Sequence, residues 1–215
     1  MRILLLADEP DKRLWDHLDK RRLEGVDLIV SCGDLPAAYL SFLTCFTPAP
    51  IVYIHGNHDA AYETHPPEGC ICIEDRVVNF HGLRIAGLGG SMRYKPGPYQ
   101  YTDQQMARRA LRLSFAIAMA HGVDMIVTHA PMRGVGDAED LCHRGFTALR
   151  DIVDRWHPMY FCHGHVHKDY DFRFQRQRAY GETTVVNAWV SHVIELEPPR
   201  PEGRRRGQRT SKEFL

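Results

Sequence analysis

Carboxylates, an amide and imidazoles follow directly after short apolar runs in this chain. Each run ends at side chains that bind metal ions or transfer protons, namely Asp8, Asp34, Asn57, His58, His129, His165 and His167. Because sites in open α/β sheets form at the carboxyl ends of strands, we expect these side chains to converge. Oxygen and nitrogen donors without a thiolate suit Mn²⁺, Fe, Zn²⁺ or Ni²⁺ rather than a structural zinc site.

The spacing of these residues supports one shared site. His165 and His167 are two apart, and extended residues two apart point to the same face. In a chain with 13 histidines a single His-x-His is weak evidence, and each histidine alone also fits a hydrogen-bonded group at a strand end. The recurrence of such residues after every run favours a common site.

The apolar runs themselves are typical of buried strands. They are Arg2–Ala7, Asp27–Cys32, Pro50–Ile54, Met125–Thr128 and Tyr160–Cys162. Helical patterns lie between them at Lys12–Leu23, Ala37–Phe46, Thr102–His121 and Phe146–Trp156, and Thr102 with Gln105 predicts a capping box. This alternation indicates an α/β protein. Ile71–Leu88 and Asp169–Leu196 instead read as successive strands, so the sheet should be mixed or split into two packed sheets.

The motifs, taken in order, resemble the calcineurin-like metallophosphoesterase superfamily. They are Asp8, Gly33-Asp34, Gly56-Asn57-His58-Asp59, His129-Ala130-Pro131 and Gly164-His165-Val166-His167. The resemblance implies an αββα sandwich of four layers, in which helices flank two packed mixed β-sheets. It also implies that metal-bound hydroxide attacks a phosphodiester or phosphomonoester in line, and we expect the diester.

The resemblance also assigns roles to single residues. One metal ion would be held by Asp34, Asn57, His129 and His165, and the other by Asp8, Asp34 and His167. His58 resembles the catalytic histidine that assists the leaving group, and Asp59 the residue that orients its imidazole. Mn²⁺ is the expected ion of the pair, with Fe, Zn²⁺ or Ni²⁺ as alternatives.

One position departs from the family pattern. The first family motif is Asp-x-His, and here it is Asp8-Glu9-Pro10. Proline offers no side-chain ligand, so one metal loses a histidine. Three outcomes follow: a dinuclear site with one weaker metal, which we expect; a site in which Glu9 or Asp11 fills in; or a mononuclear site in a slow or regulatory protein.

Substrate contacts are harder to assign from sequence. Arg93, Arg133 and His143 follow or lie near the motifs and are candidates for binding the phosphate ester. Each also fits an ordinary loop residue with a structural or solvated side chain. Pro96–Tyr101 is a turn-rich aromatic segment that either walls the pocket or packs beneath its own loop.

Length, composition and charge narrow the range of partners, domain organisations and cellular locations that we expect. The chain has 215 residues and a formal net charge of zero, which gives no support for nucleic acid as a partner. We expect one domain over residues 1–197 and a basic, flexible tail over residues 198–215. No run is long enough to span a membrane, and the six cysteines form no Cys-x-x-Cys pair, so we expect a reduced, cytoplasmic protein. The oligomeric state stays open.

Two other functions fit the same sequence. Pro10 would also suit a weakly active or non-catalytic metal-binding or interaction protein on the same fold. The basic tail would suit a nuclease, whose nucleic-acid binding should then depend on salt.

Overall fold

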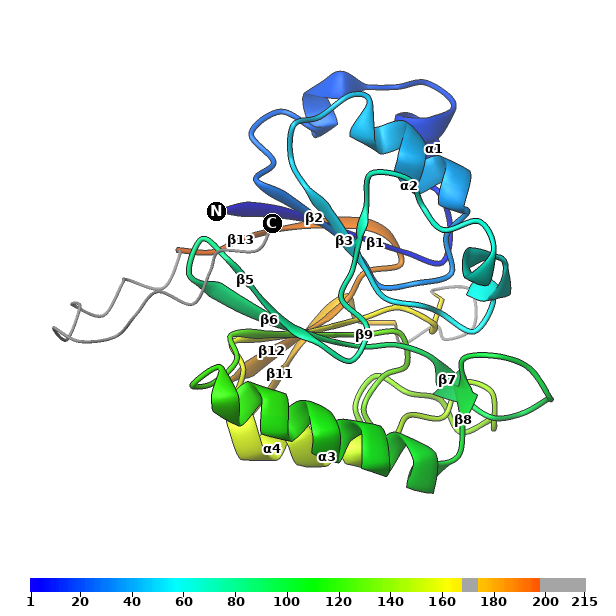
Figure 1. The fold of residues 1–215 in the computed structure, drawn as a ribbon, viewed down its shortest axis with the longest axis vertical. Coiled ribbons are helices and arrows are strands. Elements are labelled where there is room, and N and C mark those ends of the chain that lie inside the picture. The colour runs from blue at the N-terminus through cyan, green and yellow to red at the C-terminus, as the bar shows by residue number, and fades with distance from the viewer. Residues whose placement is uncertain (168–173, 198–215) are drawn as a thin grey trace, which may run out of the picture.

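The computed structural model describes residues 1–167 and 174–197. The predictions for the tail over residues 198–215, including the nuclease alternative, lie outside the described residues. Two mixed sheets pack face to face and helices cover both outer surfaces (Figure 1). The predicted four-layer α/β fold is therefore confirmed.

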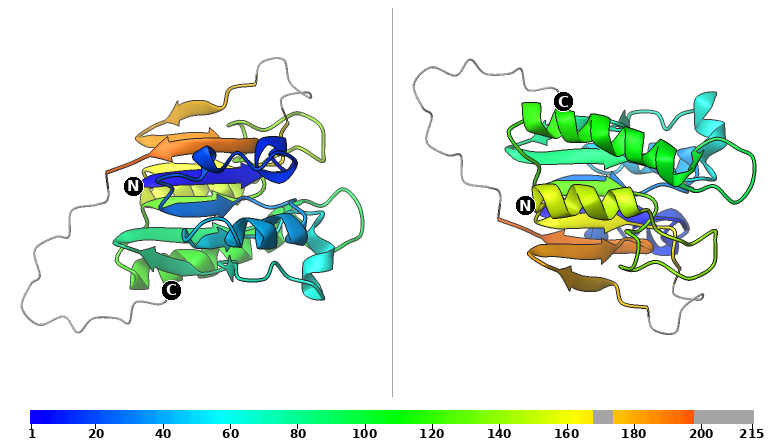
Figure 2. Two further views of the ribbon diagram at one scale, coloured as in Figure 1. Left: turned by 90° about the horizontal axis from the view of Figure 1, so that it is seen from above. Right: turned by 90° about the horizontal axis from the view of Figure 1, so that it is seen from below.

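The first sheet has five strands. Its order is β13 (Val190–Glu195), β1 (Arg2–Ala7), β2 (Leu28–Ser31), β3 (Ile51–Tyr53) and β4 (Ile71–Cys72). All neighbours are parallel except β13 and β1. Its outer face is covered by α1 (Lys12–Trp15), the 3-10 turn η1 (Lys20–Arg22) and α2 (Ala37–Thr44), as the left view of Figure 2 shows.

The second sheet has six strands. Its order is β11 (Gln177–Tyr180), β12 (Thr183–Asn187), β10 (Tyr160–His163), β9 (Met125–Thr128), β6 (Leu83–Leu88) and β5 (Val77–Phe80). Two parallel helices cover it, α3 (Asp103–Met119) and α4 (Thr147–Trp156). The turn η2 (Asp59–Glu63) and the short pair β7 (Ser91–Met92) and β8 (Gln100–Tyr101) lie in the loops near the strand ends.

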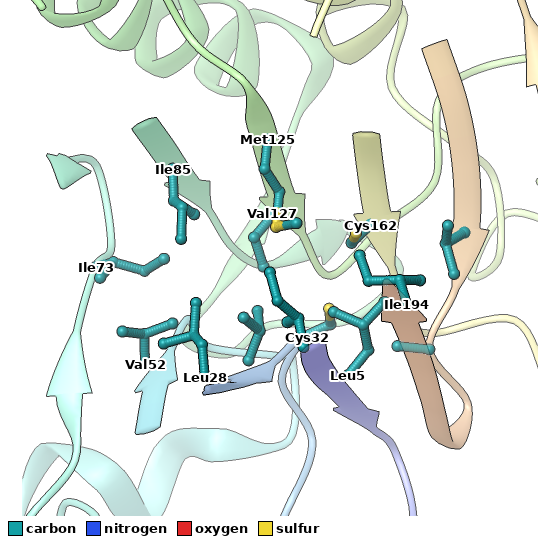
Figure 3. Close-up of a cluster of buried hydrophobic side chains, with 14 of the residues drawn as sticks. Leu5, Leu28, Cys32, Val52, Ile73, Ile85, Met125, Val127, Cys162 and Ile194 are labelled. Carbon is teal, nitrogen blue, oxygen red and sulfur yellow. The ribbon is translucent and has the colours of Figure 1, made fainter. Parts of the chain in front are cut away.

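Both faces of the central strands are buried, which explains why their sequences are unbroken apolar runs. In β1, Ile3 and Leu5 enter the core between the sheets, whereas Leu4 and Leu6 pack under the helices of the first sheet. Figure 3 shows the core between the sheets, where Leu5 and other β1 to β3 side chains face those of the second sheet. The rigid strands thus fix the positions of the loops at their ends.

Most predicted elements are confirmed with shifted ends. Thr102 caps α3 and forms the predicted capping box with Gln105. The prediction of one helix over Lys12–Leu23 is wrong: α1 ends at Trp15, and Leu18 adopts a φ of 39° that no right-handed helix continues through. All six cysteines are unpaired, and no helix in the described part of the chain is long and apolar enough to cross a membrane.

Candidate metal centre

The predicted ligands meet at the carboxyl ends of the parallel strands. Asp8 follows β1, Asp34 lies beyond β2, Asn57 beyond β3 and His129 directly after β9. All of them except the fully buried His129 border a pocket of about 380 Å³, which is lined by Asp8, Asp34, Asn57, His58, Tyr94, Cys142, His143, His165 and His167. A hollow of about 850 Å³ around Met1 and Phe80 is larger, but it holds no comparable set of donors.

Asp34, His129 and His165 form the tightest group of donors. One ligand atom from each lies within 4.8 Å of the other two. Nε2 of His129 is 3.1 Å from Asp34 Oδ2 and 3.1 Å from Asn57 Oδ1. On its other side, Nδ1 of His129 is 2.8 Å from the carbonyl oxygen of Cys32. Since a carbonyl accepts a proton, Nδ1 is the donor and Nε2 keeps the lone pair that binds a metal ion.

His165 is oriented in a similar way. Its Nε2 lies 2.6 Å from the carbonyl oxygen of Cys142, which leaves Nδ1 as the ring nitrogen for a metal. Its backbone N–H donates to Asp8 Oδ1 over 2.8 Å, and its φ of 69° turns the chain back toward the site. This hydrogen bond joins His165, which follows β10 of the second sheet, to Asp8, which follows β1 of the first sheet.

Asp8 carries the clearest sign of a missing positive partner. Its side chain is 1% exposed, and Oδ2 is buried without a hydrogen-bond partner among the described residues. Burying an unpartnered carboxylate oxygen is unfavourable, because neither water nor a donor compensates the lost hydration. A divalent cation would satisfy this oxygen, and His167, whose Nε2 is 3.7 Å from Asp8 Oδ1, lies beside it. The residues therefore fit a metal ion.

Two glycines allow the carboxylates to lie this close to the backbone. A Cβ on Gly56 would lie 2.0 Å from Asp34 Oδ1, and one on Gly164 would lie 2.9 Å from Asp8 Oδ2. Both distances are shorter than van der Waals contact. The glycines of the Gly-Asn-His-Asp and Gly-His-x-His motifs thus make room for the carboxylates.

Electrostatics favours positive charge in this group. Burial alone would raise the pKa of Asp34, but His129 and the N–H of His58 outweigh it and lower the pKa to about 2. Burial alone would lower the pKa of His129, but the carboxylates of Asp34 and Asp8 raise it. A divalent cation would supply the same positive charge that these carboxylates favour.

Asp59, which was expected to orient the His58 imidazole, contacts backbone groups in this structure. This carboxylate is buried, and its Oδ2 accepts the backbone N–H groups of Gly56 at 2.7 Å and Asp34 at 2.8 Å. No hydrogen bond joins it to the His58 imidazole among the described residues. Burial and the nearby Asp34 charge raise the pKa of Asp59 to about 6. Asp59 therefore joins the turns that carry Gly56 and Asp34, and the exposed His58 lines the pocket.

Asp11 and Glu9, on either side of Pro10, were the candidates to replace the missing histidine ligand. Asp11 caps α1, and its oxygens accept hydrogen bonds from Arg13 and Ser191, so it is already engaged. Glu9 is half-exposed, and its Oε1 lies 3.9 Å from His167 Nδ1 and 3.4 Å from Trp189 Nε1. This places Glu9 behind the His167 ring, where it can orient the ring rather than replace the missing ligand.

Two of the three predicted substrate contacts lie elsewhere. Nη2 of Arg93 donates to Gln105 Oε1 over 2.9 Å, and Nη1 of Arg133 donates to Asp137 over 2.8 Å. Neither arginine is among the residues that line the pocket, because Gln105 of α3 holds Arg93 and Asp137 of its own loop holds Arg133. His143 does line it, with its ring 5.3 Å from that of His165.

Sequence reasoning missed Tyr94 and Cys142. The Tyr94 hydroxyl lies 3.5 Å from Asn57 Nδ2 at the pocket wall. The Cys142 carbonyl orients His165, and its thiol, with Asp140 and His143, forms a second local group of donor atoms. Tyr94 precedes the aromatic segment Pro96–Tyr101, which was the available signal. A backbone carbonyl leaves no signal in the sequence.

This chain is similar to known proteins in both sequence and fold. A sequence model of calcineurin-like phosphoesterases matches residues 1–169. An uncharacterised protein of Haemophilus influenzae is 26% identical over 203 residues, covering 80% of this chain and 86% of its own. Two crystal structures share the fold at 15% identity. One has a TM-score of 0.60 and covers 90% of this chain and 94% of its own. The other is TT1561 of Thermus thermophilus, with a TM-score of 0.56 and coverages of 87% and 88%.

Proposed function

Because the chain belongs to the calcineurin-like phosphoesterase family, and so to the metal-dependent phosphoester hydrolases, we propose that it cleaves a phosphodiester at the centre described above. Membership confirms the family that the motifs predicted. The observation that carries the proposal is the buried, unpartnered Oδ2 of Asp8, which lies at the strand ends where His165 and Asp34 also point their donors.

Two divalent ions fit the donor set. One would be held by Asp34, Asn57, His129 and His165, and the other by Asp8, Asp34 and His167. Oxygen and imidazole donors suit Mn²⁺, with Fe, Zn²⁺ or Ni²⁺ as alternatives. When bound, such ions supply Lewis acidity that activates water and neutralises phosphate charge. The second ion is the weaker one, because Pro10 removes a ligand and Asp11 is engaged elsewhere.

The chain's own side chains handle the substrate and its protons. Exposed His58 lines the pocket and donates a proton to the leaving oxygen, since imidazole is the side chain that most often transfers protons at neutral pH. Its backbone N–H donates to Asp34 Oδ1 over 2.7 Å, which holds the residue beside the centre. The Tyr94 hydroxyl and the His143 ring, on the pocket wall, bind the non-reacting part of the ester.

The charge of the pocket wall favours a diester. No arginine or lysine stands among the described residues that line the pocket; Arg93 donates to Gln105 of α3, and Arg133 pairs with Asp137. A phosphomonoester carries one more negative charge than a diester near neutral pH, and proteins commonly meet this charge with arginine or lysine. A wall without such cations supports the less charged substrate.

Turnover of model aryl esters tests the proposal. With added Mn²⁺, the wild type should hydrolyse an aryl phosphodiester faster than the matching monoester. His58→Ala should lose about 100-fold or more in kcat while it retains its metal. The matched control is His17→Ala, which changes an exposed histidine between α1 and η1 that does not line the pocket and should behave as the wild type. Faster turnover of the monoester would contradict the diester preference, and undiminished turnover in His58→Ala would contradict the role of that residue.

A further inference from the structure

We propose that the outer face of α3 and α4 is the interface of a symmetric dimer of this chain. Three large apolar side chains of α3 are far more exposed than any others in the described residues: Leu111 at 68%, Phe115 at 71% and Met119 at 69%. They are four residues apart, so they form one stripe along the helix. Contiguous apolar surface of this kind marks an interaction site.

No side chain of residues 1–167 or 174–197 covers the stripe. The opposite side of α3 already packs on the second sheet through Met106, Leu113 and Ile117. A surface helix normally presents polar residues on its outer side, and a helix that is apolar on both sides contacts two partners. The second partner of α3 therefore lies outside residues 1–167 and 174–197.

A groove beside the stripe can receive a protruding side chain. It has a volume of about 170 Å³ and lies between the helices, with Ala107, Leu111, Ala148 and Ile152 in its walls. The two helices are tied together by the Trp156 indole, which donates to Ser114 Oγ over 2.7 Å. The same face thus carries both a protrusion, Phe115, and a recess, as a self-complementary surface requires.

The charged residues beside the stripe favour a second copy of this chain as the partner that covers it. At 3.6 residues per turn, Arg108 and Arg112 lie along the edge of the stripe that faces away from α4. Asp151 lines the groove on α4 at the level of Leu111, on the other edge. In the part of the chain that the structure describes, none of these three charged residues has an ion pair. The face therefore has one edge with two arginines and an opposite edge where Asp151 and Arg155 both line the groove.

A two-fold rotation about an axis parallel to the helices brings the basic edge of one copy against the Asp151 edge of the other. Because α3 and α4 each lead into neighbouring parallel strands, β9 and β10, they run in the same direction (Figure 2, right). A two-fold axis parallel to them places the stripes in contact and brings Arg108 and Arg112 of one copy to Asp151 of the other. A two-fold axis across them would oppose arginine with arginine. The metal centres lie at the strand ends, away from this face, and both stay accessible.

Sedimentation equilibrium of the full chain tests the dimer. The wild type should show twice the chain mass of 24.7 kDa, and the double variant Leu111→Glu/Phe115→Glu should show the single mass with unchanged aryl-phosphate turnover and thermal midpoint. Leu141→Glu, which changes an exposed leucine in the loop between β9 and α4, should remain dimeric. A wild type with the single mass at several hundred micromolar, or a double variant that stays dimeric, would overturn the proposal.

A charge exchange tests the orientation. Arg112→Asp and Asp151→Arg should each weaken the dimer by about tenfold or more, and the two together should restore it. Restoration supports the parallel two-fold arrangement, because only there do these positions meet. If each single change weakens the dimer and the combination weakens it further, that arrangement is wrong.

Discussion

The side chain of Asp59 accepts the backbone N–H of Asp34 over 2.8 Å, and so joins the turn after β3 to the turn after β2. Asp34 has a φ of 59°, a left-handed conformation that costs an L-residue about 1–2 kcal/mol. The same Asp59 oxygen also holds Gly56. Asp59 is therefore a positioning residue for the metal ligands on both turns.

Asp59→Ala should weaken metal binding about 10- to 100-fold, because the turn that carries Asp34 loses its support. Asp59→Asn should retain most of the affinity, since an amide oxygen can accept the same two N–H groups. Titration of the metal-free variants with Mn²⁺ measures both effects. If Asp59→Asn instead keeps its metal and loses as much turnover as His58→Ala, Asp59 acts through the imidazole.

Gly56→Ala should abolish metal binding, because the new Cβ would lie 2.0 Å from Asp34 Oδ1 and displace that carboxylate. The matched control is Gly134→Ala, whose Cβ would meet nothing within 4 Å and whose φ of 78° costs about 1 kcal/mol. Metal content after dialysis and the thermal midpoint report the two effects. Normal metal content in Gly56→Ala would show that the close approach is not required.

The strand ends and their ligands could be predicted because unbroken apolar runs followed by metal-binding residues are a local pattern. The hydrogen-bond partners of the polar side chains could not be predicted in this way. Arg93 is drawn to Gln105 by an acceptor on another element, and Asp59 to two backbone N–H groups. The break in the Lys12–Leu23 pattern was also hidden, since the left-handed Leu18 is not a residue that signals a helix end.

Pro10→His should strengthen the weaker metal, because it restores the imidazole of the family motif beside Asp8 and His167. We expect the second Mn²⁺ to bind at least about tenfold more tightly in this variant. Titration calorimetry of the metal-free protein provides the comparison. Pro10→Ala is the control, because it removes the ring without adding a ligand. Equal second-site affinity in the histidine and alanine variants would show that position 10 does not face the metal.

Glu74→Gln should destabilise the fold by about 3 kcal/mol at neutral pH, because it removes the buried carboxylate beside the Arg109 guanidinium and leaves only the half-exposed Asp75. Glu68→Gln, at an exposed position, should change little. Denaturant unfolding at neutral pH measures both values. A change below about 0.5 kcal/mol in Glu74→Gln would mean that Asp75 alone satisfies Arg109.

The ion pairs of Glu74 also predict that the free energy of unfolding decreases at acidic pH. Burial alone would raise the pKa of Glu74, but His55 and Arg109 outweigh it and hold this pKa below its ordinary value of 4.5. A lowered folded-state pKa gives stability that is present above the unfolded value and lost as pH falls through the folded one. The free energy of unfolding should therefore fall below about pH 4.5 more steeply in the wild type than in Glu74→Gln. Parallel curves would contradict this assignment.

The central claim is that ester cleavage depends on metal held by Asp8, Asp34 and the histidines around them. Its most direct test counts bound Mn²⁺ per chain and measures aryl-phosphodiester turnover on the same samples, during stepwise loading of metal-free protein. We predict a first ion that binds tightly, a second that binds more weakly, and turnover that rises with the second. Turnover that is already complete in metal-free protein, or only one ion bound at saturation, would contradict the account.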